Sequence, residues 1–594
     1  MNYQNRQEID NKYKWDLSPI FKDDEAWEAS VKELPAKVEK VTQYEGRLLE
    51  SKETLKEALE SYQEATRHLG KIYMYAHLNY DLDQKNATYQ DMNTRAGSIA
   101  SEFNQKTSFI VPEILAADEK EVEQLLTGEM EIYQQYLDNI LRKKEHTLSL
   151  KEEALLAGMG EINATPGTVF SLLNNADMEL PEIKDEEGNT RRLTHGNFIN
   201  FLQSKDQRVR KDAFEAMYSV FKGHRNTLAG LLQAQVKTNI FNARARNYPS
   251  ARAASLANNN IPESVYDALI EAVHDALPAM HKYYSIRKRV LGLEEQHIYD
   301  TYVPLVENAD MKVPFDEAKD YVIKSMKPLG EDYKKMLEES FESRWIDVYE
   351  TPGKRSGAYS SGNFDTPPYM LLNYQDNLNN LFTLTHELGH SLHSYHSKLK
   401  QPYLYARYGI FLAEIASTFN EALLNDYLMK TLEDEALKKY ILNHQIDGFK
   451  ATLFRQTMFA EFERDIHKLV EEGGSLTSEL LNQMYGELNE KYFGPDVIID
   501  EDIEFEWSRI PHFYYNFYVF QYATGISAST SFAKRVLDGE EGAVEDYLGF
   551  LSAGSSRYPM DVLKDAGLDM TDPQAIKSAL NYFSSLVDEF DNLV

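Results

Sequence analysis

The sequence predicts a mainly α-helical protein with a minor β element, and three observations lead to this fold class. Long stretches place apolar residues three and four positions apart, which is the pattern of helices with one buried face. Many of these stretches follow an Asp, Ser or Thr that can cap a helix. Segments with extended character are few and short.

The composition excludes several classes of protein. Hydrophobic residues make up 42% of the 594 positions and charged residues 27%, as in soluble globular proteins. A chain longer than about 300 residues generally forms more than one core. There is no apolar run long enough for a membrane span, and the polar N-terminus has no signal-peptide pattern, so a cytoplasmic location is expected.

The net charge and the absence of cysteine further limit the possible partners and metal ligands. The formal net charge is −32, which repels nucleic acid and anionic membranes, so neither is an expected partner. The simpler interpretation of this charge is solubility. The chain has no Cys, so disulfides and thiolate ligands are excluded, and any metal must be held by His and carboxylates.

The N-terminal part is predicted to be helical up to a hairpin. Asp24 is the expected N-cap of a first helix and Ser51 of a second, and residues 63–107 and 118–146 continue the same periodicity. Two short extended arms in 178–194 flank a Gly-Asn turn.

We place the domain boundary directly after this hairpin. The prediction is an N-terminal helical domain over 1–195 and a catalytic domain over 196–594, in which Thr194 caps the first helix. Within the second domain, helices are expected at 204–247, 262–292, 315–342, 411–431, 434–470, 477–492, 512–537, 541–552 and 574–592.

Strand-like pieces are expected at 297–302, 345–350 and 369–374. The last of them runs almost directly into the helix that carries the main motif. A small sheet beside that helix would offer an edge to an extended peptide.

The main motif is HELGH, in a helix predicted over 376–400 with Asp376 as N-cap. His386 and His390 are four residues apart, so one face of the helix directs both imidazoles at one point. Glu387 lies beside that face and can reach a metal-activated water as a base. Gly389 is costly in a helix, so we expect a metal to approach closely there.

A catalytic zinc needs a third protein ligand. His393 is on the same face but two turns from His386, so it is expected to contact the metal ligands or the substrate, or else to be an exposed side chain. His396 is expected at the surface. Glu414, among apolar neighbours after a connecting segment, is the better ligand. Glu421 then orients an imidazole through its ring N–H, unless both glutamates form a solvated face.

A second polar group follows near the C-terminus. His512, Tyr515, Tyr518 and Tyr522 are spaced so that one helical face would carry all four. Their N–H and O–H groups can stabilise the oxyanion of peptide hydrolysis. The alternative is an aromatic core stripe, in a chain with 38 Tyr.

Together these motifs resemble the thimet-oligopeptidase-like zinc peptidases, and within them the oligoendopeptidase F group. The stretches that carry the resemblance are 386–393, Glu414 with Glu421, 355–362, 367–374 and 512–525.

The resemblance implies a two-lobed helical zincin-type peptidase with a deep central channel that admits short peptides. It implies His386, His390 and Glu414 as metal ligands and Glu387 as the base. It also implies His512, Tyr522 and Tyr518 as oxyanion donors and the segment Gly357, Ala358 and Tyr359 as the substrate-pairing backbone. One tyrosine of the dipeptidyl-carboxypeptidase and thimet branches falls at Gly525 here, so the resemblance leaves the number of oxyanion donors open.

The predicted function is a zinc-dependent oligoendopeptidase that hydrolyses internal bonds of short peptides with one Zn²⁺ per chain. One alternative is a dipeptidyl carboxypeptidase, which needs a cationic group for the substrate's C-terminal carboxylate. The other is a non-catalytic helical scaffold with a chance motif, which would hold no metal. The oligomeric state is not predicted.

Overall fold

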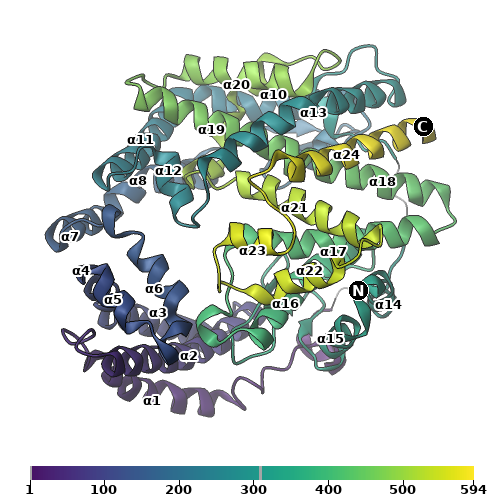
Figure 1. Cartoon of the computed structure of the whole chain (residues 1–594). Helices are drawn as coiled ribbons and strands as arrows, with labels where there is room; N and C mark the ends of the chain where they lie inside the picture. The colour runs from purple at the N-terminus through teal and green to yellow at the C-terminus, as the bar shows by residue number, and fades with distance from the viewer. Residues whose placement is uncertain (1–2, 307–310) are drawn as a thin grey trace. The chain divides into compact units, whose positions relative to one another are not determined.

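The computed structural model describes residues 3–306 and 311–594, and helices dominate it (Figure 1), as predicted. The chain forms two compact units. Unit 1 comprises Met1–Leu150, Asp310–Tyr427 and Phe532–Gly567, and unit 2 comprises Lys151–Ala309, Leu428–Ser531 and Leu568–Val594. Each unit joins segments far apart in the chain, so neither coincides with the expected division into 1–195 and 196–594. That division of the sequence stays a prediction, as does the central channel.

Three long helices begin unit 1 and lie side by side (Figure 1): α1 (Asp24–Thr42), α2 (Lys52–Leu82) and α3 (Ala87–Lys106). Asp23, one residue before the predicted cap, accepts a hydrogen bond from the backbone N–H of Ala26. Ser51 caps α2 as predicted. The expected helix over 118–146 is instead broken into α5 (Glu119–Leu125), α6 (Gln134–Leu141) and two 3-10 turns.

The core of unit 1 joins these helices to a small sheet. Trp27, Leu55 and Leu69 are buried in one cluster with Tyr369 and Leu371, which lie more than 280 residues further along the chain. The N-terminal helices are therefore part of the scaffold beneath the sheet.

The sheet has three strands in the order β3-β5-β4: β3 (Ile346–Asp347), β5 (Tyr369–Leu371) and β4 (Tyr359–Ser361). β3 pairs with β5 in parallel and β4 pairs with β5 in antiparallel register. β3 and β5 confirm two predicted strands. β4 was not expected as part of a sheet, and it is an edge strand.

The remaining helices of unit 1 are α4 (Ile110–Ala116), α14 (Phe315–Ser325), α15 (Gly330–Glu342), α16 (Leu378–Lys400), the body of α17 (Ile410–Thr431), α22 (Ala543–Ala553) and α23 (Pro559–Asp565). The predicted helix 315–342 is broken around Pro328, which cannot continue the hydrogen-bond ladder. Asn377, rather than Asp376, caps α16.

Unit 2 is built on the predicted hairpin, β1 (Glu182–Lys184) with β2 (Thr190–Arg192), and on helices. These helices are α8 (Gly160–Leu172), α9 (Phe198–Leu202), α10 (Gln207–Gly223), α11 (Arg225–Ala245), α12 (Ala251–Ala257), α13 (Glu263–Val290), α18 (Glu435–Phe449), α19 (Arg455–Glu471), α20 (Ser478–Phe493) and α24 (Pro573–Leu593). Two further helices, α7 (Leu150–Gly158) and α21 (Phe520–Leu537), cross from one unit's segments to the other's.

Several predictions for unit 2 were wrong in detail. The single helix expected over 204–247 ends and restarts at His224, and Asn197 rather than Thr194 precedes the first helix. The strand expected at 297–302 is a 3-10 helix, in which Asp300 accepts a hydrogen bond from the backbone N–H of His297. No helix in the described part of the chain is long and apolar enough to span a membrane.

Candidate metal centre

The metal motif lies on α16 where it meets α17. A Cβ added to Gly389 would lie 2.5 Å from the carbonyl oxygen of Ala416 and 2.6 Å from the Cα of Ser417. Glycine is therefore required here because the α17 backbone occupies the space of a side chain. The expectation that a metal explains this glycine was wrong.

This close approach brings three ligand atoms together. His386 Nε2 lies 3.6 Å from Glu414 Oε2, and His390 Nε2 lies 3.9 Å from the same oxygen. One ligand atom from each of the three residues falls within 4.8 Å of the other two. The structure thus places the predicted carboxylate beside the two predicted imidazoles.

The donor set fits a divalent cation. Zinc bonds to nitrogen and oxygen are about 2.0–2.2 Å long, so tetrahedral ligand atoms lie roughly 3.5 Å apart. The two measured separations are within a few tenths of an ångström of this value. Glu414 and the two imidazoles are half-buried, with 27%, 27% and 19% of their side chains exposed, so one side of the site is open.

Glu421 contacts the same site from α17. Its Oε1 lies within hydrogen-bond distance of His386 Nδ1, on the side of the ring opposite the Nε2 that approaches Glu414. Burial disfavours charge on His386, but the bond to Glu421 and the surrounding carboxylates raise its pKa to about 9. Burial and the neighbouring His386 lower the pKa of His390 to about 4.

Glu387 contacts the backbone of Ser360 in the edge strand β4. Its side chain is buried, and desolvation raises its pKa to about 7, partly opposed by the charge of His386 and by the backbone amide of Ser360. Ser360 Oγ also lies 2.8 Å from Ser391 Oγ on α16. The edge strand β4 is therefore attached to the helix at the predicted base.

The segment before and within β4 is held by polar side chains. Asn373 Nδ2 donates to the carbonyl oxygens of Arg355 and Gly357, and Gly357 adopts a left-handed φ of 85°. Tyr359 donates its hydroxyl to Asp81 Oδ2 of α2 at 2.8 Å. Asp81 was missed by the sequence analysis because it lies 278 residues from its partner.

Two histidines of the motif helix do not lie where they were expected. His393 is fully buried and stacks on Tyr408 at a centroid distance of 3.6 Å, so it is neither exposed nor directed at the metal ligands. His396, expected at the surface, is 7% exposed and stacks on Tyr333. Tyr408, in the chain that returns after α16, covers His393, and Tyr333 of α15 covers His396.

The four residues predicted near the C-terminus do form a cluster in unit 2: His512, Tyr515, Tyr518 and Tyr522. His512 lies 5.7 Å from Tyr515, 6.3 Å from Tyr518 and 6.2 Å from Tyr522, measured between ring centroids. They are not on one helical face, because α21 begins only at Phe520. A turn gathers them, and the prediction of a helix over 512–519 was wrong.

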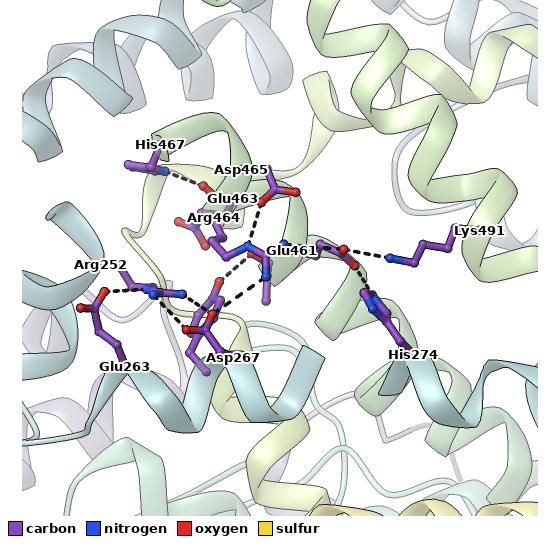
Figure 2. Close-up of polar contacts among 12 residues, drawn as sticks. Arg252, Glu263, Asp267, His274, Glu461, Glu463, Arg464, Asp465, His467 and Lys491 are labelled. Atoms are coloured by element: carbon purple, nitrogen blue, oxygen red, sulfur yellow. Dashed lines mark hydrogen bonds and ion pairs between the residues drawn. The ribbon is translucent and has the colours of Figure 1, made fainter. Parts of the chain in front are cut away.

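This turn depends on a buried carboxylate. Asn516 and Phe517 both have a positive φ, of 52° and 56°, and the backbone N–H of Phe517 donates to Glu463 Oε1 at 2.6 Å. Glu463 is fully buried, and desolvation raises its pKa to about 8. Figure 2 shows His467 donating to the backbone oxygen of Glu463, one turn before it on α19.

The same close-up (Figure 2) shows the ion pairs beside Glu463. Arg252 of α12 contacts Asp267 of α13, and Arg464 lies beside Asp267 and Glu461. None of these cations reaches Glu463, whose second oxygen has no hydrogen-bond partner in the described chain. In the sequence, Glu463 lies four residues after Phe459 and three before Ile466. This spacing places it on the apolar face of the helix, which is a signal for its burial.

Comparison with known proteins decides the family. The family model described as Peptidase family M3 matches residues 200–582, and the one described as Oligopeptidase F matches 113–179. The chain belongs to peptidase family M3. It is therefore a metalloendopeptidase that uses a metal cofactor and acts on peptides, and the predicted family and enzyme class are confirmed.

Relatives of this M3 peptidase extend over nearly its whole length. Oligopeptidase PepF of Bacillus subtilis is 49% identical over 591 residues, covering 99% of this chain and 88% of the relative. Group B oligopeptidase PepB of Streptococcus agalactiae is 45% identical and covers 99% and 98%.

Solved structures agree with the fold. Oligoendopeptidase-F of Enterococcus faecium is 41% identical, with a TM-score of 0.74 over 96% of this chain and 99% of that one. A Chlamydophila abortus chain is 37% identical, with a TM-score of 0.94 over 100% of both chains.

Proposed function

We propose that this M3 peptidase is a zinc-dependent oligoendopeptidase that hydrolyses internal bonds of short peptides. The observation that carries the proposal is the convergence of His386, His390 and Glu414 from two neighbouring helices. Two imidazoles and one carboxylate, with a side left open, are a typical donor set of catalytic zinc. One Zn²⁺ per chain would be held there.

A cation in this site would polarise the scissile carbonyl and make a neighbouring water more acidic. Glu387 is the proposed general base: its carboxylate accepts a proton from the attacking water as the new C–O bond forms. Glu387 then gives this proton to the leaving amine nitrogen as the C–N bond breaks. Burial, which raises the pKa of this carboxyl, favours its proton-carrying form between the two steps.

Two further groups support this chemistry in the proposal. Glu421 orients His386 through its ring Nδ1, so that Nε2 would offer its lone pair to a cation. Gly357, Ala358 and Tyr359 lead into the edge strand β4 and would pair with the backbone of an extended substrate.

We assign the oxyanion donors to the unit 2 cluster. His512, Tyr518 and Tyr522 present the N–H and O–H groups that such an intermediate requires, and Tyr515 flanks them. This part of the proposal rests on the chemistry of these side chains. His393 has no role in it, because its ring is buried against Tyr408.

The test combines metal analysis with product analysis. We expect one zinc per chain after gentle purification, loss of peptide cleavage with a chelator and its return with Zn²⁺. Peptides blocked at both ends should still be cut internally, as mass spectrometry would show. Release of dipeptides only from free C-termini would instead indicate a dipeptidyl carboxypeptidase, and activity without metal would overturn the proposal.

A further inference from the structure

A cavity in unit 1 lies beside the C-terminal half of the helix that carries the metal motif. It has a volume of about 280 Å³ and lies between the end of β4, the segment 403–408 and the C-terminal half of α16. Ser361 and Gly362 line one wall, and Ser394 and Lys398 of α16 line another. Its volume is close to the lower limit for small-molecule pockets, so it can accept a side chain or a chain end.

The charge of this cavity is opposite to that of the protein. Lys398 and Arg407 are in its lining and no Asp or Glu is, although the whole chain has a net charge of −32. Arg407 is exposed, and it forms no ion pair with any residue among 3–306 and 311–594. Lys398 donates to the carbonyl oxygen of Thr366, and burial lowers its pKa to about 8, so it carries charge at neutral pH.

The cavity and the metal centre lie on one stripe of α16. Thr383, Glu387, His390, Ser394 and Lys398 follow one another at intervals of four, three, four and four residues, which places them on one helical face.

β4 follows the same stripe. A further cavity of about 300 Å³ includes Gly357, Ala358 and Thr383, whereas the cationic cavity includes Ser361 and Ser394. Ser360, at the end of the cationic cavity, contacts Ser391 of α16 and, through its backbone, Glu387. An extended peptide paired with β4 would therefore enter one cavity on each side of the metal centre.

The distance between the metal centre and the cationic cavity can be expressed as a number of substrate residues, because both lie along α16. His390 and Ser394 are separated by about 6 Å along the helix axis, and His390 and Lys398 by about 12 Å, at 1.5 Å per residue. An extended peptide advances about 3.3 Å per residue. The cationic cavity thus lies two to four residues from the bond at the metal centre.

We propose that this cavity is a substrate subsite for a carboxylate two to four residues from the scissile bond, bound by Arg407 and Lys398. The guanidinium of Arg407 can accept a carboxylate in bidentate fashion, and the lysine adds a point charge. The carboxylate belongs either to an Asp or Glu side chain or to the C-terminus of the peptide. The inference rests on the proposed function, because it requires cleavage at the metal centre.

The experiment compares matched peptides on the metal-loaded full-length enzyme. In one arm, peptides with an amidated C-terminus carry either Gln or Glu at one position. That position is two, three or four residues from the cleaved bond, on either side of it. The other arm compares free-acid and amide C-termini at the same distances. We expect kcat/KM to be about tenfold higher for the acidic member at one position, and the arm that shows it identifies the source.

Variants test the assignment. Arg407→Gln and Lys398→Met should each lower the ratio of kcat/KM between the acidic and the neutral peptide severalfold, and Arg407→Glu should favour a Lys-containing peptide. Lys400→Gln, which removes the same charge from α16 outside the cavity, should preserve the preference. Equal kcat/KM for all pairs, or an unchanged preference in both cavity variants, overturns the subsite. If the unmodified enzyme cleaves none of these peptides, the result contradicts the proposed function instead.

Discussion

Gly389 sets the distance between the two helices that carry the metal ligands. Its missing side chain lets the α17 backbone come within the space of a Cβ atom. Since His386 and His390 are on one helix and Glu414 is on the other, the separation of the helices decides whether the three ligand atoms can share a cation.

Gly389→Ala should therefore destabilise unit 1 and weaken metal binding together. Overpacking of this kind costs about 1–3 kcal/mol, because two backbones must move apart. Thermal unfolding and zinc titration would measure both effects. Gly549→Ala in α22 is the matched control, because a Cβ there meets nothing within 4 Å and alanine favours a helix. A Gly389→Ala protein as stable as the control would contradict this account.

Glu387 and Glu421 are expected to separate catalysis from metal affinity. Glu387→Gln should keep full metal occupancy and lose about 10²–10⁴-fold in kcat, because the general base is gone. Glu421→Gln should weaken zinc binding about 10–100-fold, because the imidazole loses its anionic partner. Competition with a chromophoric chelator and steady-state kinetics would show this; identical behaviour of the two variants would refute the division of roles.

At the scale of elements, the turn at 515–518 shows a helix prediction overturned by tertiary contacts. Two consecutive residues with positive φ interrupt the aromatic run, and such backbone strain needs support from its surroundings. The support includes Glu463, whose carboxylate accepts from the Phe517 backbone, and Ser255, which donates to the carbonyl oxygen of Asn516.

Glu463 predicts a pH dependence of stability. Its pKa of about 8 in the folded protein lies above the value of about 4.3 for an unfolded chain, so the folded state binds more protons between these values. Its contribution to stability is complete below pH 4 and is lost progressively as the pH rises toward 8. Glu463→Gln removes the titrating group, so we expect the variant to keep its stability as the pH rises. Its Tm minus that of the parent protein should therefore increase with pH.

Thermal scans of both proteins between pH 5 and 9 would measure this difference. Glu472→Gln, a change of the same charge at the exposed C-terminal end of α19, serves as the control and should show no such growth. A Tm difference between parent and Glu463→Gln that is independent of pH would show that the carboxyl does not titrate in this range.

At the scale of the whole molecule, the arrangement of segments matters more than their order in the chain. Unit 1 needs Met1–Leu150 as well as the segments that carry the metal ligands, because Tyr369 and Leu371 share one buried cluster with α1 and α2. Hydrogen bonds such as Tyr359 to Asp81 connect the same parts.

The predicted catalytic domain 196–594 should therefore not fold by itself. Expressed alone, it exposes the face of the sheet that α1 and α2 cover, so we expect unit 1 to remain unfolded and the fragment to bind no stoichiometric zinc. Co-expression with 1–195 should restore zinc binding. A fragment 196–594 that unfolds cooperatively and binds zinc would show that the sequence boundary is also a folding boundary.

Much of the metal centre could be predicted because its pattern is local. The spacing of His386 and His390 depends only on the helical repeat, and Glu414 and Glu421 follow on the next helix at a spacing of seven residues. Neighbouring helices with complementary polar residues leave few alternatives for a metal site.

The remaining features depend on contacts between distant segments. The burial of His393 depends on the returning chain at Tyr408, and the formation of β4 depends on its pairing with β5. The turn before α21 depends on Glu463. None of these contacts can be recognised from a periodic pattern in the sequence of the segments that it joins.

The sequence alone thus determined the helical class, the metal-binding motif and the type of chemistry, because periodicity and residue type are properties of short segments. The tertiary structure decided why Gly389 is needed, where the edge strand lies and which segments share a core. Packing brings together residues hundreds of positions apart, and the free energy of that packing outweighs the local preferences from which the sequence was interpreted.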